Sequence, residues 1–193
     1  VSPEVLVDLH QYAKDANVPI HIHLAQTKKE MEYIKEKYDT SPIKHAFNLG
    51  ILDKDVIAAH CKVIESGDLE ILSESNCFPV FCPTTHGLSG TPMDTNFLTE
   101  NKTEWGIGTD CSGGNDDYDM LEEMRAAILI NNTHSRGSLL TPKKIFDIST
   151  RLNASRLSLN YMKGTLAVGE LADFISIKIN NSRMQPIHDV INN

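Results

Sequence analysis

The stretch VPIHIHLAQT, Val18–Thr27, places two histidines two positions apart in an apolar run. Alternate side chains of a β-strand point to the same face, so His21 and His23 are expected on one face of a strand. The run is followed by a T-x-x-E pattern, Thr27 with Glu30, which is typical of a helix N-terminus. The stretch therefore predicts a buried strand that passes directly into a helix, with His23 near the carboxyl end of the strand.

The same alternation of strand and helix continues along the chain. Apolar runs that are too short for helices predict strands at residues 19–25, 56–60, 78–82 and 105–109. Amphipathic segments between and after these runs predict helices, two of them at residues 142–150 and 155–159, and polar loops are expected at 84–93 and 111–117. Because each strand is continuously apolar rather than alternating, we expect a parallel sheet covered by helices, an α/β fold.

Composition and net charge limit the classes of protein to which this chain can belong. The 193 residues are 40% hydrophobic and 23% charged, which suits one folded domain with at most a small appendage. A net charge of −8 argues against a nucleic acid or an anionic membrane surface as the main partner. We find no apolar run of about 18 residues and no signal-peptide pattern. Four cysteines without a C-x-x-C pair suit free thiols in a reducing compartment, so a cytoplasmic location is expected.

Three of the predicted strands end on or just before a residue that can bind a metal or a proton, namely His23, His60 and Asp110. The carboxyl ends of parallel strands meet at one edge of the sheet, where such folds place their chemistry. Neutral imidazole and carboxylate are common ligands of catalytic zinc or iron, and the metal lowers the pKa of bound water towards about 7. This pattern leaves two classes equally open, a metal-dependent hydrolase and a nucleotide-binding α/β domain with incidental histidines.

Five short motifs occur in an order that resembles the second half of enzymes of the amidohydrolase superfamily. They are HLAQT at 23–27, AAHC at 58–61, FCPTTH at 81–86, GIGTD at 106–110 and GTLAVGELAD at 164–173. The most similar branch holds guanine, cytosine and methylthioadenosine or adenosylhomocysteine deaminases together with triazine chlorohydrolases. The resemblance implies strands five to eight of a metal-dependent (β/α)8 TIM barrel at residues 1–163. Residues 164–193 would then be a segment of a small β-domain and a tail.

The resemblance also implies roles for individual residues. His23 would be the metal ligand after strand five, and Asp110 the strand-eight ligand and proton acceptor. His60 would contact the hydrolytic water or the substrate, while Gln26 and His86 would contact the substrate. The implied cofactor is one divalent metal ion, zinc in the first place and iron as the alternative.

Two departures from the family pattern affect these expectations. Deaminases of this branch carry a proton-shuttling glutamate three residues after the metal histidine, where this chain has Gln26, which can hydrogen-bond a substrate but cannot relay a proton in the same way. The spacing of His21 and His23 also matches the H-x-H motif that provides the family's first two metal ligands after strand one of the barrel. Only three strand-helix units follow this pair, however, whereas seven such units would follow strand one of an eight-stranded barrel. We therefore expect His23 to be the single ligand of the pair and His21 to be an interior barrel residue.

The resulting hypothesis is a metal-dependent hydrolase of carbon–nitrogen bonds other than peptide bonds. It would be an aminohydrolase of a purine, pyrimidine or triazine-like ring, present here as a fragment that lacks the N-terminal metal ligands. One alternative is a chlorohydrolase with a halide leaving group, and another is a catalytically incomplete half-barrel that acts as an interaction module. The expected partners are a small-molecule substrate and further copies of the chain in a homo-oligomer, with neither nucleic acid nor a membrane.

Several features have simpler interpretations. Four histidines on helical or tail segments are expected at the surface: His10, His45, His134 and His188. Glu122 and Glu123 are most simply a solvated helix face, and residues 164–179 are expected to form a turn and then a β-strand. The zinc deaminases with H-x-E and P-C-x-x-C signatures are excluded, because neither pattern occurs in the sequence.

Overall fold

The computed structural model of the protein describes residues 2–134, 139–157, 164–180, 185 and 187–189. Its centre is a four-stranded, fully parallel sheet in which the strands follow one another in sequence order. The strands are β1 Ile20–Leu24, β2 Val56–His60, β3 Phe78–Phe81 and β4 Gly106–Ile107. All four predicted strands are therefore confirmed, β2 with the predicted bounds, β1 and β3 slightly shorter and β4 reduced to two residues, and the fold is α/β with a parallel sheet.

Burial explains why the two central strands are so apolar. Every residue of β2 and of β3 is buried, whereas β1 alternates between partly exposed and exposed side chains up to Leu24, which is buried. The edge strand β1 pairs with β2 in a register that sets Leu24 opposite His60. Both β1 and β4 have a neighbour on one side only in the described sheet, so the sheet has two open edges.

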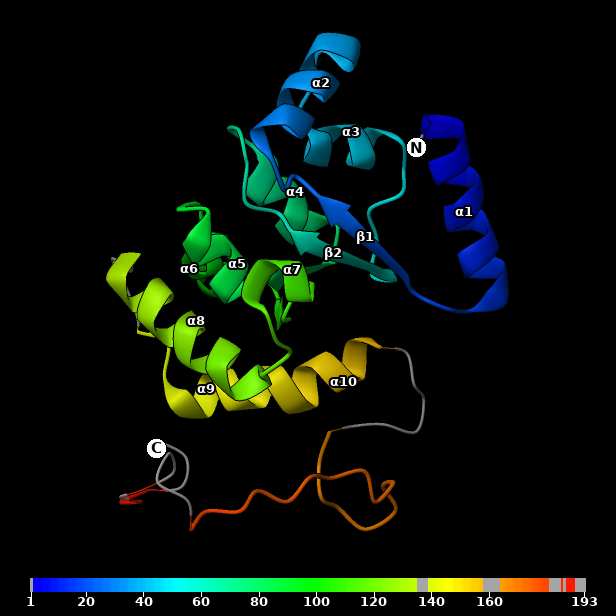
Figure 1. The fold of residues 1–193 in the computed structure, drawn as a ribbon. Coiled ribbons are helices and arrows are strands. Elements are labelled where there is room, and N and C mark those ends of the chain that lie inside the picture. Colours follow the sequence, from blue (N-terminus) through cyan, green and yellow to red (C-terminus); the bar gives the residue numbers. More distant parts are fainter. Residues whose placement is uncertain (1, 135–138, 158–163, 181–184, 186, 190–193) are drawn as a thin grey trace.

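Helices connect the strands and cover the sheet (Figure 1). They are α1 Pro3–Ala16, α2 Lys28–Tyr38, α3 Pro42–Asn48, α4 Asp68–Glu74, α5 Pro83–Leu88, α6 Thr95–Glu100, α7 Ser112–Asn115, α8 Met120–His134, α9 Pro142–Asp147, the π-helical turn η1 Ile148–Leu152, and α10 Asn153–Arg156. Their apolar side chains join those of the strands in one continuous core. Within the described residues, no helix combines the length and the hydropathy needed to cross a lipid bilayer.

The predicted capping box at the start of α2 is confirmed. The side chain of Thr27 accepts a hydrogen bond from the backbone N–H of Glu30, and the carboxylate of Glu30 accepts one in return from Thr27. The same carboxylate accepts hydrogen bonds from the backbone N–H groups of Ala25, at 2.8 Å, and Gln26, at 2.7 Å. One glutamate thus fixes both the helix start and the segment that leaves β1.

The predictions for the loops and the late helices need correction. Residues 84–93 were expected to be a loop, but most of α5 lies there, because Pro83 occupies the first helical turn and the side chains of Pro83 and His86 are buried. Residues 111–117 contain the short helix α7. The helix expected at 142–150 changes from α9 into η1, and the one expected at 155–159 is observed as α10, with residues 158 and 159 outside the described part of the chain.

The segment 164–180 forms the predicted turn but not the predicted strand. The backbone N–H of Glu170 donates to the carbonyl of Ala167 at 3.2 Å, which closes the turn. The described residues that follow form no strand, and the side chains of Phe174 and Ile175 are largely exposed. Figure 1 shows this segment running apart from the sheet, where no described strand can accept its backbone hydrogen bonds. The division at residues 163 and 164 stays a prediction, since parts of 164–193 lie outside the described residues.

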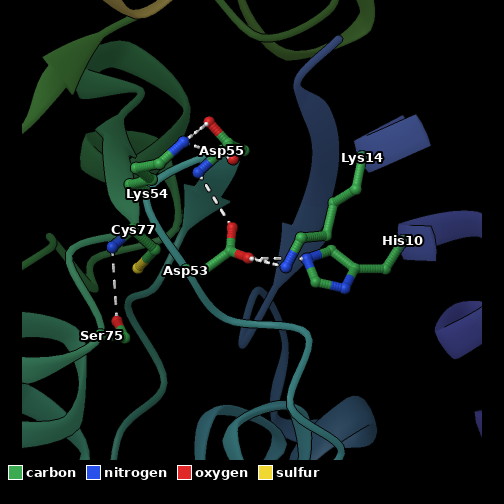
Figure 2. A network of polar contacts seen from close by, with 7 residues as sticks. All are labelled: His10, Lys14, Asp53, Lys54, Asp55, Ser75 and Cys77. Carbon is green, nitrogen blue, oxygen red and sulfur yellow. Dashed lines mark hydrogen bonds and ion pairs between the residues drawn. The ribbon is translucent and has the colours of Figure 1, made fainter. Parts of the chain in front are cut away.

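A polar network at the amino end of β2 corrects the expectation for His10 (Figure 2). His10 was expected at the surface, but it is the one buried residue of α1, and its Nε2 lies 3.0 Å from Oδ2 of Asp53. Lys14 donates to the same oxygen at 3.4 Å, and the backbone N–H of Asp55 donates to Oδ1 at 2.9 Å. Asp53 therefore fastens α1 to the segment that enters the sheet, at the end opposite the predicted site.

Candidate active site

The carboxyl edge of the sheet brings together the three residues predicted from the strand ends. His23 lies on β1, His60 ends β2, and Asp110 is the third residue after β4. One ligand atom from each lies within 4.8 Å of those from the other two, and the rings of His23 and His60 have centroids 5.1 Å apart. The parallel register produces this convergence, because equivalent ends of neighbouring strands meet.

The backbone turns sharply at these positions. His60 and Asp110 have φ values of 80° and 58°, and Ala25 and Cys61, next to the strand ends, have 51° and 42°. A left-handed conformation in a residue other than glycine costs about 1–3 kcal/mol, and such residues cluster at functional sites. A hydrogen bond of 2.9 Å from the N–H of Cys61 to the carbonyl of Leu24 helps hold the turn after β2.

Electrostatics set the charge state of His60. Burial lowers the pKa of the His60 imidazole to about 4, Asp110 opposes this shift, and His23 adds to it. The ring is therefore neutral at neutral pH, as ligation of a metal requires. Its Nε2 is buried and has no hydrogen-bond partner among the described residues, which leaves this atom available to a group bound at the site. The two imidazoles and the carboxylate thus fit a divalent metal ion and its bound water.

His86 is a buried neighbour of His60. It is fully buried on α5, its Nε2 lies 3.1 Å from Nδ1 of His60, and its ring centroid is 5.2 Å from that of Phe81. Burial lowers the pKa of His86 to about 3. The ring contacts His60 and Phe81, and its predicted contact with a substrate stays a prediction. Gln26 is partly exposed beside the site, and its contact with substrate also stays a prediction.

A second group of possible metal ligands consists of His60, Cys82 and His86, whose ligand atoms also lie within 4.8 Å of one another. All three side chains are buried, and burial raises the pKa of the Cys82 thiol to about 12. A catalytic metal keeps one position open to water and binds cysteine as the thiolate. The group of His23, His60 and Asp110, with an exposed histidine and a partly exposed aspartate, meets these requirements better.

One further expectation about a side chain near the site stays a prediction, and another is wrong. His21 was expected inside a barrel; it is exposed in the described four-stranded sheet, as is His23 on the same face of β1, so its position in a closed barrel stays a prediction. Glu123 was expected in solvent but is fully buried, where it accepts hydrogen bonds from the backbone N–H of Thr84, at 3.0 Å, and from the Thr84 hydroxyl. Burial raises the pKa of Glu123. This carboxylate fastens α8 to the first turn of α5, the helix that carries His86.

The other three histidines lie away from the site. His134 and His188 are exposed as expected, whereas His45 is partly buried and stacks on Tyr38 with centroids 4.1 Å apart. No local pattern in the sequence marks Glu123 as a partner of α5, because it contacts Thr84, 39 residues away. His86 was expected near the site from its motif, but its contact with His60 was not predicted.

A comparison with protein families matches residues 1–192 to the amidohydrolase family. The chain belongs to this family. Among its relatives is a 5-methylthioadenosine/S-adenosylhomocysteine deaminase of Thermococcus sibiricus, 34% identical over 98% of the chain and 45% of the relative. Another is a 5'-deoxyadenosine deaminase of Methanococcus maripaludis, 30% identical over the same shares of each chain. This amidohydrolase chain therefore spans about half the length of the curated relatives that it matches.

Solved structures show the same fold. An adenosine deaminase from Xanthomonas campestris with bound zinc superimposes with a TM-score of 0.90 at 23% identity, covering 99% of this chain and 44% of that one. A mutant atrazine chlorohydrolase from Arthrobacter aurescens, complexed with zinc and atraton, gives 0.88 at 19% identity, covering 100% and 43%. At these identities the likeness establishes the fold of this amidohydrolase chain and no more.

Proposed function

We propose that this chain forms part of a metal-dependent hydrolase that removes an amino group from the purine ring of an adenosine-type nucleoside. The observation that carries the proposal is the convergence of His23, His60 and Asp110 at the carboxyl edge of a parallel sheet. The substrate class is supported by relatives at 30–34% identity that are named as deaminases of 5-methylthioadenosine, S-adenosylhomocysteine and 5'-deoxyadenosine.

His23 and Asp110 would hold one divalent ion. An imidazole nitrogen with a carboxylate oxygen suits zinc, with iron as the alternative, and zinc is present in two of the matched structures. When bound, such an ion lowers the pKa of its water towards about 7, so that hydroxide is available at neutral pH. The residue types and the spacing of this cluster fit that requirement.

The chain's own residues would then handle the proton and orient the reactants. The carboxylate of Asp110 takes the proton of the attacking water, and His60 hydrogen-bonds that water or the substrate. The water oxygen adds to the ring carbon that carries the amino group, while the proton taken by Asp110 passes to the adjacent ring nitrogen. The remaining hydroxyl proton then passes, again by way of Asp110, to the amino nitrogen, the carbon–nitrogen bond breaks, and ammonia leaves a ring carbonyl behind. Gln26 binds the substrate but does not deliver the proton to the amine, because an amide cannot exchange a proton as a carboxyl group does.

We also infer that the four strands correspond to strands five to eight of the barrel. Their sequential parallel order, the open edge at β1 and the 45% coverage of the relatives support this assignment. The remaining strands and the H-x-H ligands would come from further polypeptide, either a longer form of this chain or another copy in a homo-oligomer. The native reading frame and the mass of the purified particle distinguish the two sources.

Release of chloride from a triazine is the second candidate reaction. Gln26 favours it, because a halide leaves without the proton that a leaving amine needs. Parallel assays of ammonia from 5-methylthioadenosine and of chloride from atrazine separate the two reactions. A third hypothesis is a half-barrel that only binds a partner. It predicts that neither ammonia nor chloride is released and that no zinc is tightly bound.

The metal assignment is tested by exchanging either histidine of β1 in the full-length protein. His23→Ala should abolish the binding of stoichiometric zinc, measured by mass spectrometry of the metal. It should also lower the rate of ammonia release by more than the roughly 10- to 100-fold that is typical when a residue hydrogen-bonded to a metal ligand is replaced. His21→Ala, on the same face of the same strand, should retain the zinc. Equal zinc in both variants would contradict the assignment of His23.

A further inference from the structure

A cavity of about 190 Å³ is lined by α6, by α8, by the segment that enters α6 and by the end of β3. Among the described residues that line it, none belongs to the cluster of His23, His60 and Asp110. An apolar cavity of about 150 Å³ can hold a benzene ring. This cavity therefore has room for one small organic molecule, at a place separate from the candidate active site.

One part of the lining is apolar. Phe81 and Met93 are only 1% and 3% exposed, and Ile130 lies beside them in the lining with its side chain partly buried. Aromatic and thioether side chains pack well against an apolar ring or chain. This part of the cavity therefore favours the hydrocarbon part of a ligand.

Asn131, which also lines the cavity, has a buried oxygen without a partner. The residue is 6% exposed, and its Nδ2 donates to Oγ1 of Thr95 at 2.5 Å and to Oδ1 of Asn96 at 3.2 Å. These two hydrogen bonds use both hydrogens of the amide. Oδ1 of Asn131 is buried and has no hydrogen-bond partner among the described residues. Because buried polar atoms are ordinarily hydrogen-bonded, this oxygen favours a ligand with an N–H or O–H donor.

Asp94 adds a negative charge to the same lining. Its side chain is exposed, and Oδ1 accepts a hydrogen bond from the backbone N–H of Phe97 at 2.9 Å, which caps α6. Within the described part of the chain, no cationic side chain forms an ion pair with this carboxylate. A hollow with a negative group and apolar walls attracts cations, and the net charge of −8 acts in the same direction.

We propose that this cavity binds a small protonated amine with an apolar body. The ammonium group donates to Oδ1 of Asn131 and faces the Asp94 carboxylate, and the hydrocarbon part packs on Phe81, Met93 and Ile130. A ligand without a donor would leave Oδ1 of Asn131 unpaired, and an anion would be repelled by Asp94. The site requires neither a metal nor the proposed hydrolysis, so it stands independently of the proposed function.

Benzylamine is the probe, and benzyl alcohol and toluene are neutral molecules of similar size for comparison. Each is titrated into the full-length protein, and binding is followed by 1H–15N NMR of the backbone amides. Benzylamine should bind one molecule per chain with a Kd of about 1 mM or lower and should shift the amides of residues 93–96 and 130–134. Benzyl alcohol, which has a donor but no charge, should bind about 10-fold more weakly, and toluene more weakly still.

Asp94→Asn tests the charge. Asparagine caps a helix as well as aspartate does, so this change removes the charge and keeps the start of α6. It should weaken benzylamine about 10-fold and leave benzyl alcohol unchanged. Asp119→Asn is the matched control, because Asp119 is also exposed and accepts from the backbone N–H of Leu121 at 2.9 Å but does not line the cavity. It should leave the affinity for all three molecules unchanged.

Asn131→Leu tests the buried acceptor. It should weaken benzylamine and benzyl alcohol but not toluene, and retained binding of toluene shows that the cavity persists in the variant. Equal affinities of benzylamine and toluene for the wild type would overturn the proposal, as would failure of benzylamine to bind or to shift the stated amides. A folded Asp94→Asn protein that binds benzylamine as the wild type does would also overturn it, and this result does not depend on whether Asn131→Leu folds.

Discussion

Replacing Asp53 by asparagine should destabilise the protein without touching the active site. The Asp53 carboxylate accepts from Lys14 and from the backbone of Asp55, and it bonds the buried ring of His10 (Figure 2). These contacts join α1 to the start of β2. Asp53→Asn keeps the size of the side chain and an oxygen that can accept the hydrogen bond from the backbone N–H of Asp55. It removes the negative charge that faces His10 and Lys14.

The magnitude follows from the partners. A hydrogen bond to a charged group contributes about 1.5–3 kcal/mol, of which a neutral amide retains part. The pair with Lys14 is half exposed and 3.4 Å long, so it adds no more than about 1 kcal/mol. We expect Asp53→Asn to lower the free energy of unfolding by about 2 kcal/mol at pH 7.

The loss should depend on pH with a definite sign. Burial by itself raises the pKa of Asp53, but the Asp55 N–H, His10 and Lys14 outweigh it and hold the pKa below its ordinary value. A carboxyl group whose pKa is depressed by folding stabilises the folded state above its unfolded pKa of about 3.9, and this stability is lost as the pH falls through the folded pKa. The difference between wild type and variant should therefore be full at pH 7 and shrink below about pH 4.

Urea denaturation of both proteins at pH 7 and pH 3 measures this difference. Asp55→Asn is the matched control, because the Asp55 carboxylate contacts the exposed Lys54 and an exposed pair of this kind contributes less than about 1 kcal/mol. An equal loss in the two variants, or a loss for Asp53→Asn that does not change with pH, would refute the reasoning.

Two further predictions concern packing. Gly106→Ala would place a Cβ against the ring of Phe78 and 2.6 Å from Oδ1 of Asn153, so thermal unfolding should show a loss of about 1–3 kcal/mol, while Gly113→Ala, whose nearest contact is 3.6 Å, should be nearly neutral. Leu72→Ala empties a fully buried position and should cost about 2–5 kcal/mol in urea denaturation, whereas a loss below about 0.5 kcal/mol would show that the surroundings collapse into the space.

The strands and the convergence of the site were predictable because they depend on local pattern and on simple geometry. A buried parallel strand needs a continuous apolar run, and Val56–His60 matches its prediction residue for residue. The capping box of Thr27 and Glu30 fixes where β1 gives way to α2. Once the strands are parallel, their carboxyl ends meet, so His23 and Asp110 were expected together, and the structure places them in one cluster.

The burial of polar residues was not predictable in this way. His10 and Glu123 have the spacing of surface positions on their helices, yet both are buried against partners 43 and 39 residues away. The helix at Pro83–Leu88 forms in a stretch rich in Gly and Thr, with Pro83 in its first turn and two side chains buried in the core. Such contacts cannot be predicted from a local sequence pattern, because they depend on which segments of the chain the fold brings together.

The sequence by itself therefore determined the parallel α/β architecture and the set His23, His60 and Asp110, since these follow from periodicity and from the geometry of strand ends. Only the tertiary structure determined which buried side chains contact these three residues. The ring of His86 reaches His60 across 26 residues of sequence, and the sheet and α5 bring the two within hydrogen-bond distance. This contact depends on the burial of both rings, which is a property of the packed molecule alone.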